Sequence, residues 1–175
     1  MNGVAGGNFE EFLLRIESPA LRAVAQHWHE ARRTRRMPAL ADLPPPALAP
    51  YAKFLWSFAY DPKTGQFTGR LAGDRWSKWA GKDFHGRPLK DFHSASSYRE
   101  SRELLTRIVT TPQAFRSSGR LFAVDDFAVT GERIVLPLAT DGKTGDGVLG
   151  ASHYVSPPLL GQLEMIHENI EWYAI

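Results

Sequence analysis

Apolar residues recur at the spacing of an amphipathic helix in four parts of the chain. Three of these patterns start behind a Ser or Asn that can cap a helix, and the last follows a pair of prolines. The patterns predict helices over residues 9–16, from Ser18-Pro19 to the break at Pro38, from a capping box at Ser97 to Thr111-Pro112, and through residues 157–175.

Other stretches alternate apolar and polar residues, as β-strands do. Residues 53–61 carry aromatic side chains at alternate positions, DPKTG (61–65) has turn chemistry, and residues 66–73 alternate again, which predicts a β-hairpin. Residues 74–81 suit one or two helical turns. Two strands, then helices, then three strands is the order of an α+β fold. The three later strands are expected at residues 119–124, 132–140 and 147–154.

Composition narrows the class of protein. The chain has 175 residues, 43% of them hydrophobic, which suits one domain with a real core, and its net charge is only +2. It contains no cysteine, which excludes disulfides, thiolate catalysis, Cys-based zinc sites and any flavin–cysteine adduct. No apolar run reaches the roughly 18 residues of a membrane span, and the N-terminus lacks a signal-peptide pattern. We therefore expect a soluble, cytoplasmic protein.

Several motifs match known sites in letters but not in context. GDGVLG (145–150) fits the dinucleotide pattern but opens a strand instead of a helix. GKT (142–144) lacks the glycine that a phosphate-binding loop needs five residues earlier. In HWHE (27–30) the histidines lie two apart, on different helix faces, so we interpret Trp28 as core and the histidines as facing solvent. RRTRR (32–36) ends a predicted helix, where cations favour the helix dipole.

Five further stretches occur together in an order typical of one family. They are Trp28 with Arg32 and Arg33; Pro38, Asp42 and Pro46; RLAG at 70–73; Gly81 with GRPL at 86–89; and ERIVLPL at 132–138. In this order and spacing, the chain from about Leu21 to Tyr154 resembles a PAS-domain family of small, often stand-alone alphaproteobacterial proteins.

The resemblance implies a five-stranded antiparallel sheet covered on one face by short helices, with flanking N- and C-terminal helices. We divide the chain into a flexible segment and helix (1–17), a PAS-like domain (18–156) and a C-terminal helix (157–175). PAS domains sense small ligands or mediate protein contacts and are usually not enzymes. The resemblance thus implies a bacterial sensor for signal transduction. Pro137 would fall inside a strand, so we expect a bulge or a donor-free position there.

Aromatic residues gather in and around RLAGDRWSKWAGKDFHGRPLKDF (70–92). One interpretation is that they fill the core. The other is an apolar cavity with a few polar groups, the usual form of a small-molecule site. The candidate lining residues are Trp56, Phe58, Arg70, Trp76, Trp79, Phe84, Phe92, His93 and Ser152. The ligand of such a cavity is expected to be a small apolar molecule, whose identity stays open, and any cofactor stays unknown. His85 or His93 could ligate haem, but a lone histidine is more often a hydrogen-bonded residue, and we do not expect haem.

The partner is expected to be a second copy of the chain and an unidentified signalling protein. Flanking helices commonly pair two PAS subunits, and an unpaired N-terminal helix would expose the apolar residues Phe9, Phe12, Leu13 and Ile16. Two other classes are kept as alternatives. A small cone-shaped α+β enzyme or ligand carrier would use His93 with Asp91 or Asp83 in the cavity. A nucleic-acid role would use RRTRR and the basic residues of 70–90, and we do not expect it.

Overall fold

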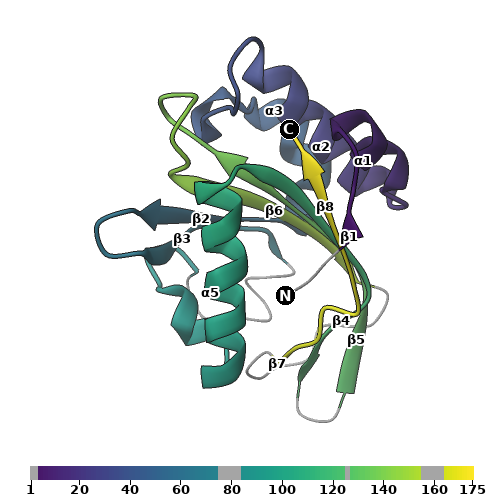
Figure 1. Ribbon diagram of the computed structural model, residues 1–175, viewed down its shortest axis with the longest axis vertical. Helices are drawn as coiled ribbons and strands as arrows, with labels where there is room; N and C mark the ends of the chain where they lie inside the picture. The colour runs from purple at the N-terminus through teal and green to yellow at the C-terminus, as the bar shows by residue number, and fades with distance from the viewer. Residues whose placement is uncertain (1–3, 75–83, 125–126, 155–163) are drawn as a thin grey trace.

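The computed structural model describes residues 4–74, 84–124, 127–154 and 164–175 (Figure 1). The first half of the chain forms β1 (Val4–Ala5), α1 (Phe9–Arg15), α2 (Pro19–Arg32), η1 (Leu40–Asp42), α3 (Pro45–Leu48), η2 (Ala49–Phe54), β2 (Leu55–Asp61) and β3 (Gln66–Ala72). The second half forms η3 (Leu89–Phe92), α5 (Ala95–Thr110), β4 (Gln113–Val124), β5 (Phe127–Leu138), β6 (Gly147–Tyr154), β7 (Glu164–Met165) and β8 (Asn169–Ala174).

The strands form one curved sheet in the order β1-β8-β4-β5-β6-β2-β3, with β7 paired to β4. The five neighbouring strands β4-β5-β6-β2-β3 are all paired antiparallel, and they are the five strands that the sequence predicts. The expected α+β, PAS-like fold is confirmed. Strands β4 and β5 are longer than predicted, because their first residues continue the hairpin beyond the alternating apolar runs.

Helix starts follow the local capping chemistry. The Asn8 side chain accepts a hydrogen bond from the Glu11 amide, and Ser18 caps α2 with Pro19 in its first turn, as predicted. The third helix starts earlier than predicted: its cap is Ser94, whose hydroxyl accepts from the Ser97 amide. Ser97 is therefore inside α5, where it is buried.

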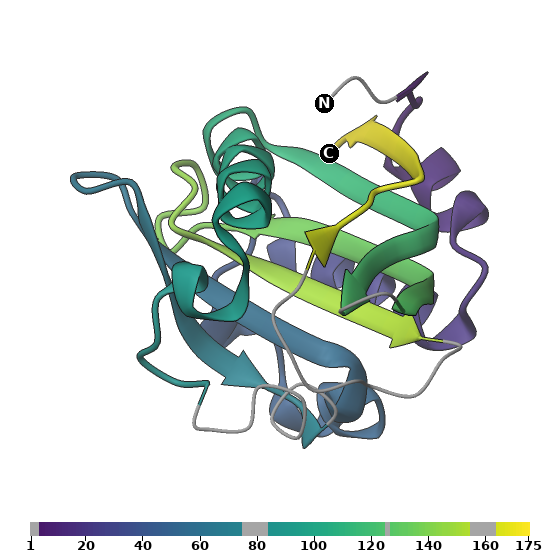
Figure 2. The same ribbon diagram turned by 90° about the horizontal axis from the view of Figure 1, so that it is seen from below.

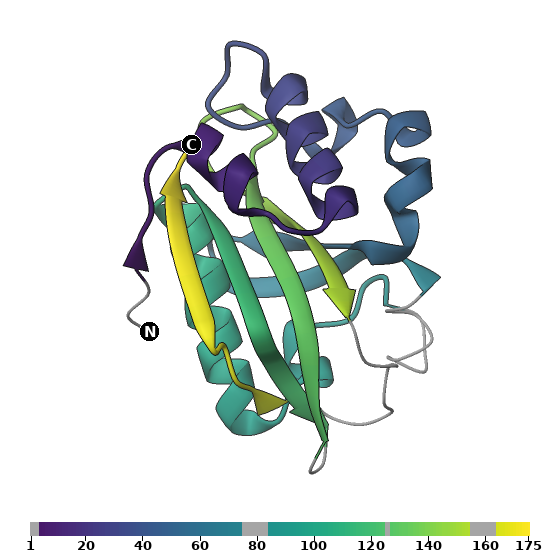
Figure 3. The ribbon, with the colours of Figure 1, turned by 90° about the vertical axis from the view of Figure 1, so that its right-hand side faces the viewer.

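Helices cover both faces of the sheet (Figures 1 and 3). One core packs α5 residues such as Ile108 against one set of alternate sheet residues, Val135 among them. The other core packs α1 and α2, including Trp28, against the opposite set, with Ile134 and Leu136. Because side chains alternate across a strand, these sets point to opposite faces. The N-terminal helices are therefore a structural layer and do not stand apart from the domain.

The predicted C-terminal helix is wrong. Within the described part of residues 157–175, the chain forms β7 and β8 (Figure 2). On β8, Trp172 enters the core under α5 while Tyr173 enters the core under α1. β8 pairs with β4 over Gln113–Ser118, so the backbone groups of β4 that would otherwise lie at an edge are satisfied by a strand.

Residues 4–7 pair with the last strand of the sheet. β1 runs parallel to β8, with Val4 opposite Glu171 and Ala5 opposite Trp172. The Gly6 amide donates to the Trp172 carbonyl, and the Ala174 amide donates to the Gly7 carbonyl. The two ends of the chain are thus joined at one edge of the sheet.

Pro137 lies at a donor-free position of β5. The neighbouring Leu138 carbonyl accepts from the Asp146 amide, so Leu138 directs its polar groups to the β6 side and Pro137 directs its own to the other side. On that other side β4 pairs with β5 only as far as Val135. The Pro137 carbonyl instead accepts the indole N–H of Trp28 at 2.8 Å. The missing proline N–H therefore leaves no ladder bond broken.

Gly145 and Asp146 of GDGVLG lie in the connection before β6 and the other four residues begin β6, so the stretch opens a strand, which agrees with rejecting it as a dinucleotide site. None of the described helices is long and apolar enough to cross a membrane.

Candidate ligand-binding cavity

A cavity lies between α5 and the sheet face that α5 covers. Its volume is about 30 Å³. One water molecule needs roughly 10–15 Å³ of cavity volume. The cavity therefore has room for about two or three waters or for a ligand of a few non-hydrogen atoms. The lining residues are Trp56, Phe58, Leu89, His93, Ser101, Leu104, Leu105, Phe115, Arg133, Val135, Met165 and His167.

Most of the wall is apolar because regular elements direct their buried faces at it. α5 contributes Leu104 and Leu105, and alternate positions of β2 contribute Trp56 and Phe58. The indole of Trp56 lies over Gly150 of β6, where an added Cβ would come within 2.1 Å of the ring. Glycine at this position therefore lets the indole lie flat against the sheet as one wall of the cavity.

Arg133 brings a positive charge into this apolar wall. Arg133 is buried, with 5% of its surface exposed. Its Nε lies 3.4 Å from the Ser152 hydroxyl, its Nη1 lies 3.9 Å from the Met165 sulfur, and its Nη2 has no hydrogen-bond partner. Among the described residues, no carboxylate forms an ion pair with it. A buried guanidinium without a compensating charge is unfavourable.

Two histidines share this side of the cavity. Nδ1 of His93 and both ring nitrogens of His167 are shielded from solvent and lack hydrogen-bond partners. Burial, together with the charge of Arg133, lowers the pKa of each imidazole to about 3. Both rings are therefore neutral near pH 7, and among the described lining residues only Arg133 carries a formal charge.

β7 and the residues after it are held against the start of α5. The Met165 amide donates to the Ser97 hydroxyl at 2.7 Å, and that hydroxyl donates to Glu164 at 3.2 Å. His167 follows with φ of 49°, a left-handed conformation that is disfavoured for a residue with a side chain. Such strain is retained where the surroundings enforce it, and here it directs an imidazole to the cavity.

A family model described as "PAS domain" matches residues 16–153. The chain belongs to the PAS domain family. PAS domains are typically sensory or regulatory and usually non-catalytic. Among curated proteins no significant match to this PAS domain was found. Among solved structures it is similar to the crystal structure of the Rhodobacter sphaeroides LOV protein, with 12% sequence identity, 75% of this chain and 68% of that chain covered, and a TM-score of 0.39. That likeness is too distant to carry an argument about function.

The structure brings some of the predicted site residues of this PAS domain together. Trp56, Phe58 and His93 line the cavity, and Ser152 lies behind it, where its hydroxyl also accepts the Trp56 indole N–H at 3.0 Å. Phe84 and Phe92 stack on each other and contact Phe58 edge-on, which makes them core neighbours of the cavity.

The other predicted residues do not line the cavity or cannot be assessed. Arg70 is half-buried and is absent from the lining; its guanidinium lies near Gly147. Trp76 and Trp79 lie outside the described residues.

Sequence reasoning missed Arg133, Ser101 and His167. The signal for Arg133 was available: it is a charged residue at the start of the apolar run RIVLPL. Ser101 occupies a buried position on the apolar face of α5, one turn before Leu104 and Leu105. His167 had no local signal, because its segment was interpreted as a helix. Only the pairing of β7 and β8 with β4 brings His167 to the cavity.

The predicted exposed apolar patch on the N-terminal helix is wrong. Phe9, Phe12 and Ile16 are buried within the chain, and Leu13 is partly buried against the same core. Phe9 stacks on Trp28, and Phe12 contacts Tyr173 of β8. These side chains are therefore not available as a dimer interface, and homodimerisation stays a prediction without support from α1.

The acid–base pair of the enzyme alternative is not formed with Asp91. Asp91 is exposed and accepts a hydrogen bond from Arg87 at 3.3 Å, while His93 is directed into the cavity. Asp83 lies outside the described residues. No cluster of three metal-ligating side chains occurs in the part of the chain that the structure describes.

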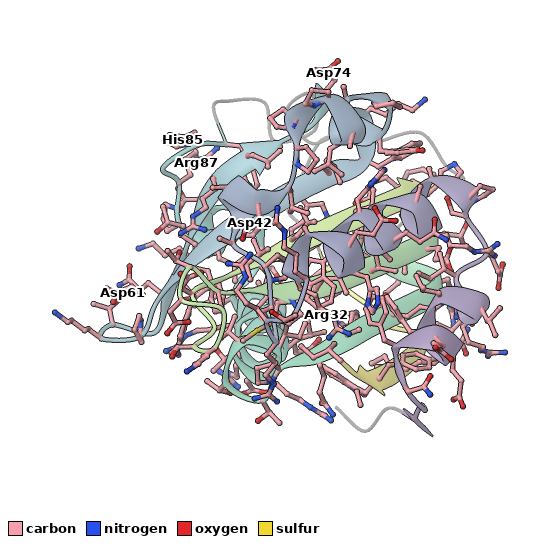
Figure 4. The ribbon with its side chains drawn as sticks, turned by 90° about the horizontal axis from the view of Figure 1, so that it is seen from above. Arg32, Asp42, Asp61, Asp74, His85 and Arg87 are labelled. Carbon is pink, nitrogen blue, oxygen red and sulfur yellow. The ribbon has the colours of Figure 1, made fainter. Side chains whose placement is uncertain are left out.

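Two of the four arginines of RRTRR, Arg32 and Arg35, have structural partners. The Arg32 guanidinium lies 5.9 Å from the rings of Phe9 and Trp28, and Arg35 is ion-paired with Asp42. Figure 4 shows Arg32 well apart from His85 and Arg87. His29 stacks on Phe9 and is half-buried, which corrects its prediction as a solvent-facing residue.

Proposed function

We propose that this PAS domain is a non-catalytic sensory or regulatory module that holds a small molecule in the cavity between α5 and the sheet. It transmits the occupancy of that cavity through contact with another protein. The family match supports a sensory or regulatory role. The cavity supports a ligand as the signal.

One observation is the main support for a bound ligand. In the part of the chain that the structure describes, five buried polar atoms without hydrogen-bond partners belong to four residues that line one otherwise apolar cavity. Buried polar groups in folded proteins are nearly always hydrogen-bonded, and an apolar pocket with a few convergent polar groups is the common form of a small-molecule site. The four residues are His93, Ser101, Arg133 and His167.

Two elements that contact the cavity also reach the surface, so binding of a ligand can be detected there. Ser101 lies on α5, and His167 lies between β7 and β8. A ligand bonded to both would tie α5 to the C-terminal strands, which are otherwise joined here by Ser97 and its partners. We infer that the outer face of α5 and the adjoining C-terminal strands are where a signalling partner detects the ligand.

The test is the mass of the freshly purified protein under native conditions, compared with its denatured mass. We expect extra mass on the native ion. Ser101→Leu fills the cavity and should abolish the extra mass, whereas Glu103→Leu, at an exposed position of the same helix, should keep it. A native ion without extra mass, in a protein that also fails to respond to a panel of small molecules, would overturn the proposal.

A further inference from the structure

The charge balance of the cavity specifies its occupant more closely. Of the lining residues that the structure describes, Arg133 alone is formally charged, and its guanidinium offers five N–H donors. Among the described residues, it contacts the Ser152 hydroxyl at 3.4 Å, the Met165 thioether at 3.9 Å and the Phe122 ring, whose centroid lies 5.7 Å from the guanidinium carbon. None of these three groups carries a negative charge. A carboxylate matches the planar fork of a guanidinium and supplies the missing negative charge.

We propose that the cavity binds a short-chain monocarboxylate of about two to four carbon atoms, with its carboxylate on Arg133. This inference rests on the proposed function, because it names the ligand class of the same cavity.

The number of charges favours a monovalent anion. Both cavity histidines are neutral near pH 7, since their pKa values lie at about 3. One guanidinium can neutralise one carboxylate, whereas a dianion such as phosphate would leave a buried charge without compensation. Ser101 Oγ can donate a second hydrogen bond to the carboxylate, and a neutral imidazole can donate one from its protonated nitrogen.

The size and the walls favour a short alkyl chain. A volume of about 30 Å³ takes only a few non-hydrogen atoms. The lining also includes hydrocarbon side chains, among them Leu104, Leu105 and Val135. A methyl, ethyl or propyl group would displace water from these surfaces, which is favourable. A free inorganic anion would leave them wet.

The experiment compares carboxylates with neutral molecules of the same shape. Acetate, propionate and butyrate are titrated against acetamide, propionamide and butyramide, in a carboxylate-free buffer with ionic strength held constant by sodium chloride. The readout is the NMR signal of the Trp56 indole N–H, which donates to Ser152 beside Arg133. The Trp28 indole, bonded to Pro137 in the other core, is the internal reference.

We expect the carboxylates to shift the Trp56 signal to saturation, and the amides and chloride to leave it in place. Arg133→Met should lower the affinity for the carboxylates by about thirtyfold or more, because the buried cation that pairs with the anion is lost. The control variant Arg120→Met, which replaces an exposed arginine of β4, should bind the carboxylates with the affinity of the unchanged protein. If Arg133→Met does not fold, Ser101→Ala removes one donor and should weaken binding roughly tenfold.

Several outcomes would overturn the inference, and they separate it from the proposed function. Equal binding of amides and carboxylates, saturation by chloride, or a large apolar ligand on the native ion would each contradict a short carboxylate while leaving a ligand-binding PAS domain. Failure of every small molecule to move the Trp56 signal, with no extra mass on the native ion, would contradict both.

Discussion

Two buried arginines on neighbouring strands have opposite surroundings. Arg133 has no carboxylate partner among the described residues, whereas Arg116 of β4 has three, with its Nε 2.7 Å from Glu132, Nη1 2.5 Å from Glu171 and Nη2 3.1 Å from Glu17. Burial by itself would lower the pKa of Arg116, but the hydrogen bonds and charges of Glu132 and Glu171 hold it above its ordinary value. We interpret the Arg116 network as structural, whereas Arg133 is the group to which we propose that a ligand binds.

Replacing Arg116 tests the structural network. Arg116→Met leaves Glu132 buried without its cation, so we expect the free energy of unfolding to fall by about 3–5 kcal/mol. Arg120→Met, which changes a surface pair with Glu168, should change it by less than about 0.5 kcal/mol. Urea unfolding of the two variants measures the difference; equal midpoints would mean that the network does not stabilise the fold.

Trp28 is the residue-scale test of the second core. It is 0% exposed, stacks on Phe9 and donates its indole N–H to Pro137. We expect Trp28→Ala to destabilise the fold by about 3–5 kcal/mol, as large-to-small core substitutions do. Leu14→Ala, at a side chain that is 80% exposed, is the control for thermal unfolding. An unchanged midpoint for Trp28→Ala would show that this core contributes little.

At the scale of elements, α1 is a core helix and β8 is an edge-covering strand. α1 packs between α2 and β8, and Glu17, just after it, reaches Arg116 on β4. The backbone amides of Glu17 and Ser18 both donate to the buried Glu132 carboxylate, at 3.0 and 2.7 Å. The N-terminal segment is therefore fastened to the sheet by apolar packing and by charge.

Deleting residues 1–17 tests this attachment. The deletion uncovers Trp28 and Tyr173 and removes one partner of Arg116, so we expect the free energy of unfolding to fall by roughly 3 kcal/mol or more. Phe12→Ala should act in the same direction, because Phe12 is fully buried. Thermal unfolding and light scattering are measured together. A change from dimer to monomer at an unchanged midpoint would contradict this packing and restore α1 as an interface.

At the scale of the whole molecule, stability depends on pH through the buried histidines. His93 and His167 have a pKa of about 3 in the folded protein, against 6.5 ordinarily. The unfolded chain thus binds more protons between these values, and stability falls as the pH drops below about 6.5. The charged or titratable groups that influence His93 are Arg133 on β5 and His167 before β8.

The pH dependence can be measured before the carboxylates titrate. Between pH 6.5 and about 5, above the ordinary range of Asp and Glu, His93→Asn should flatten the loss of stability. His85→Asn, at an exposed histidine, should leave the slope unchanged. Urea unfolding at several pH values, in carboxylate-free buffer, provides the slopes. An identical slope in His93→Asn would mean that this imidazole is not kept neutral by the fold.

Local chemistry in the sequence determined much of this protein. Asn8 and Ser18 begin α1 and α2 where predicted, β6 covers the predicted residues 147–154, and the alternation of β2 placed Trp56 and Phe58 on the cavity face. Caps, turns and the periods of helix and strand depend on a few neighbouring residues, so they can be recognised without a fold. The same holds for the absence of cysteine chemistry.

The tertiary structure alone decided the rest. The apolar residues of 157–175 fit a helical period, but the edge of β4 offers backbone partners, and Trp172 and Tyr173 reach different cores only from a strand. The apolar stripe of α1 also fits a dimer interface, and only the position of β8 shows what it covers. The cavity joins Ser101, Arg133 and His167 from three distant segments, because strand pairing, and not sequence spacing, brings them together.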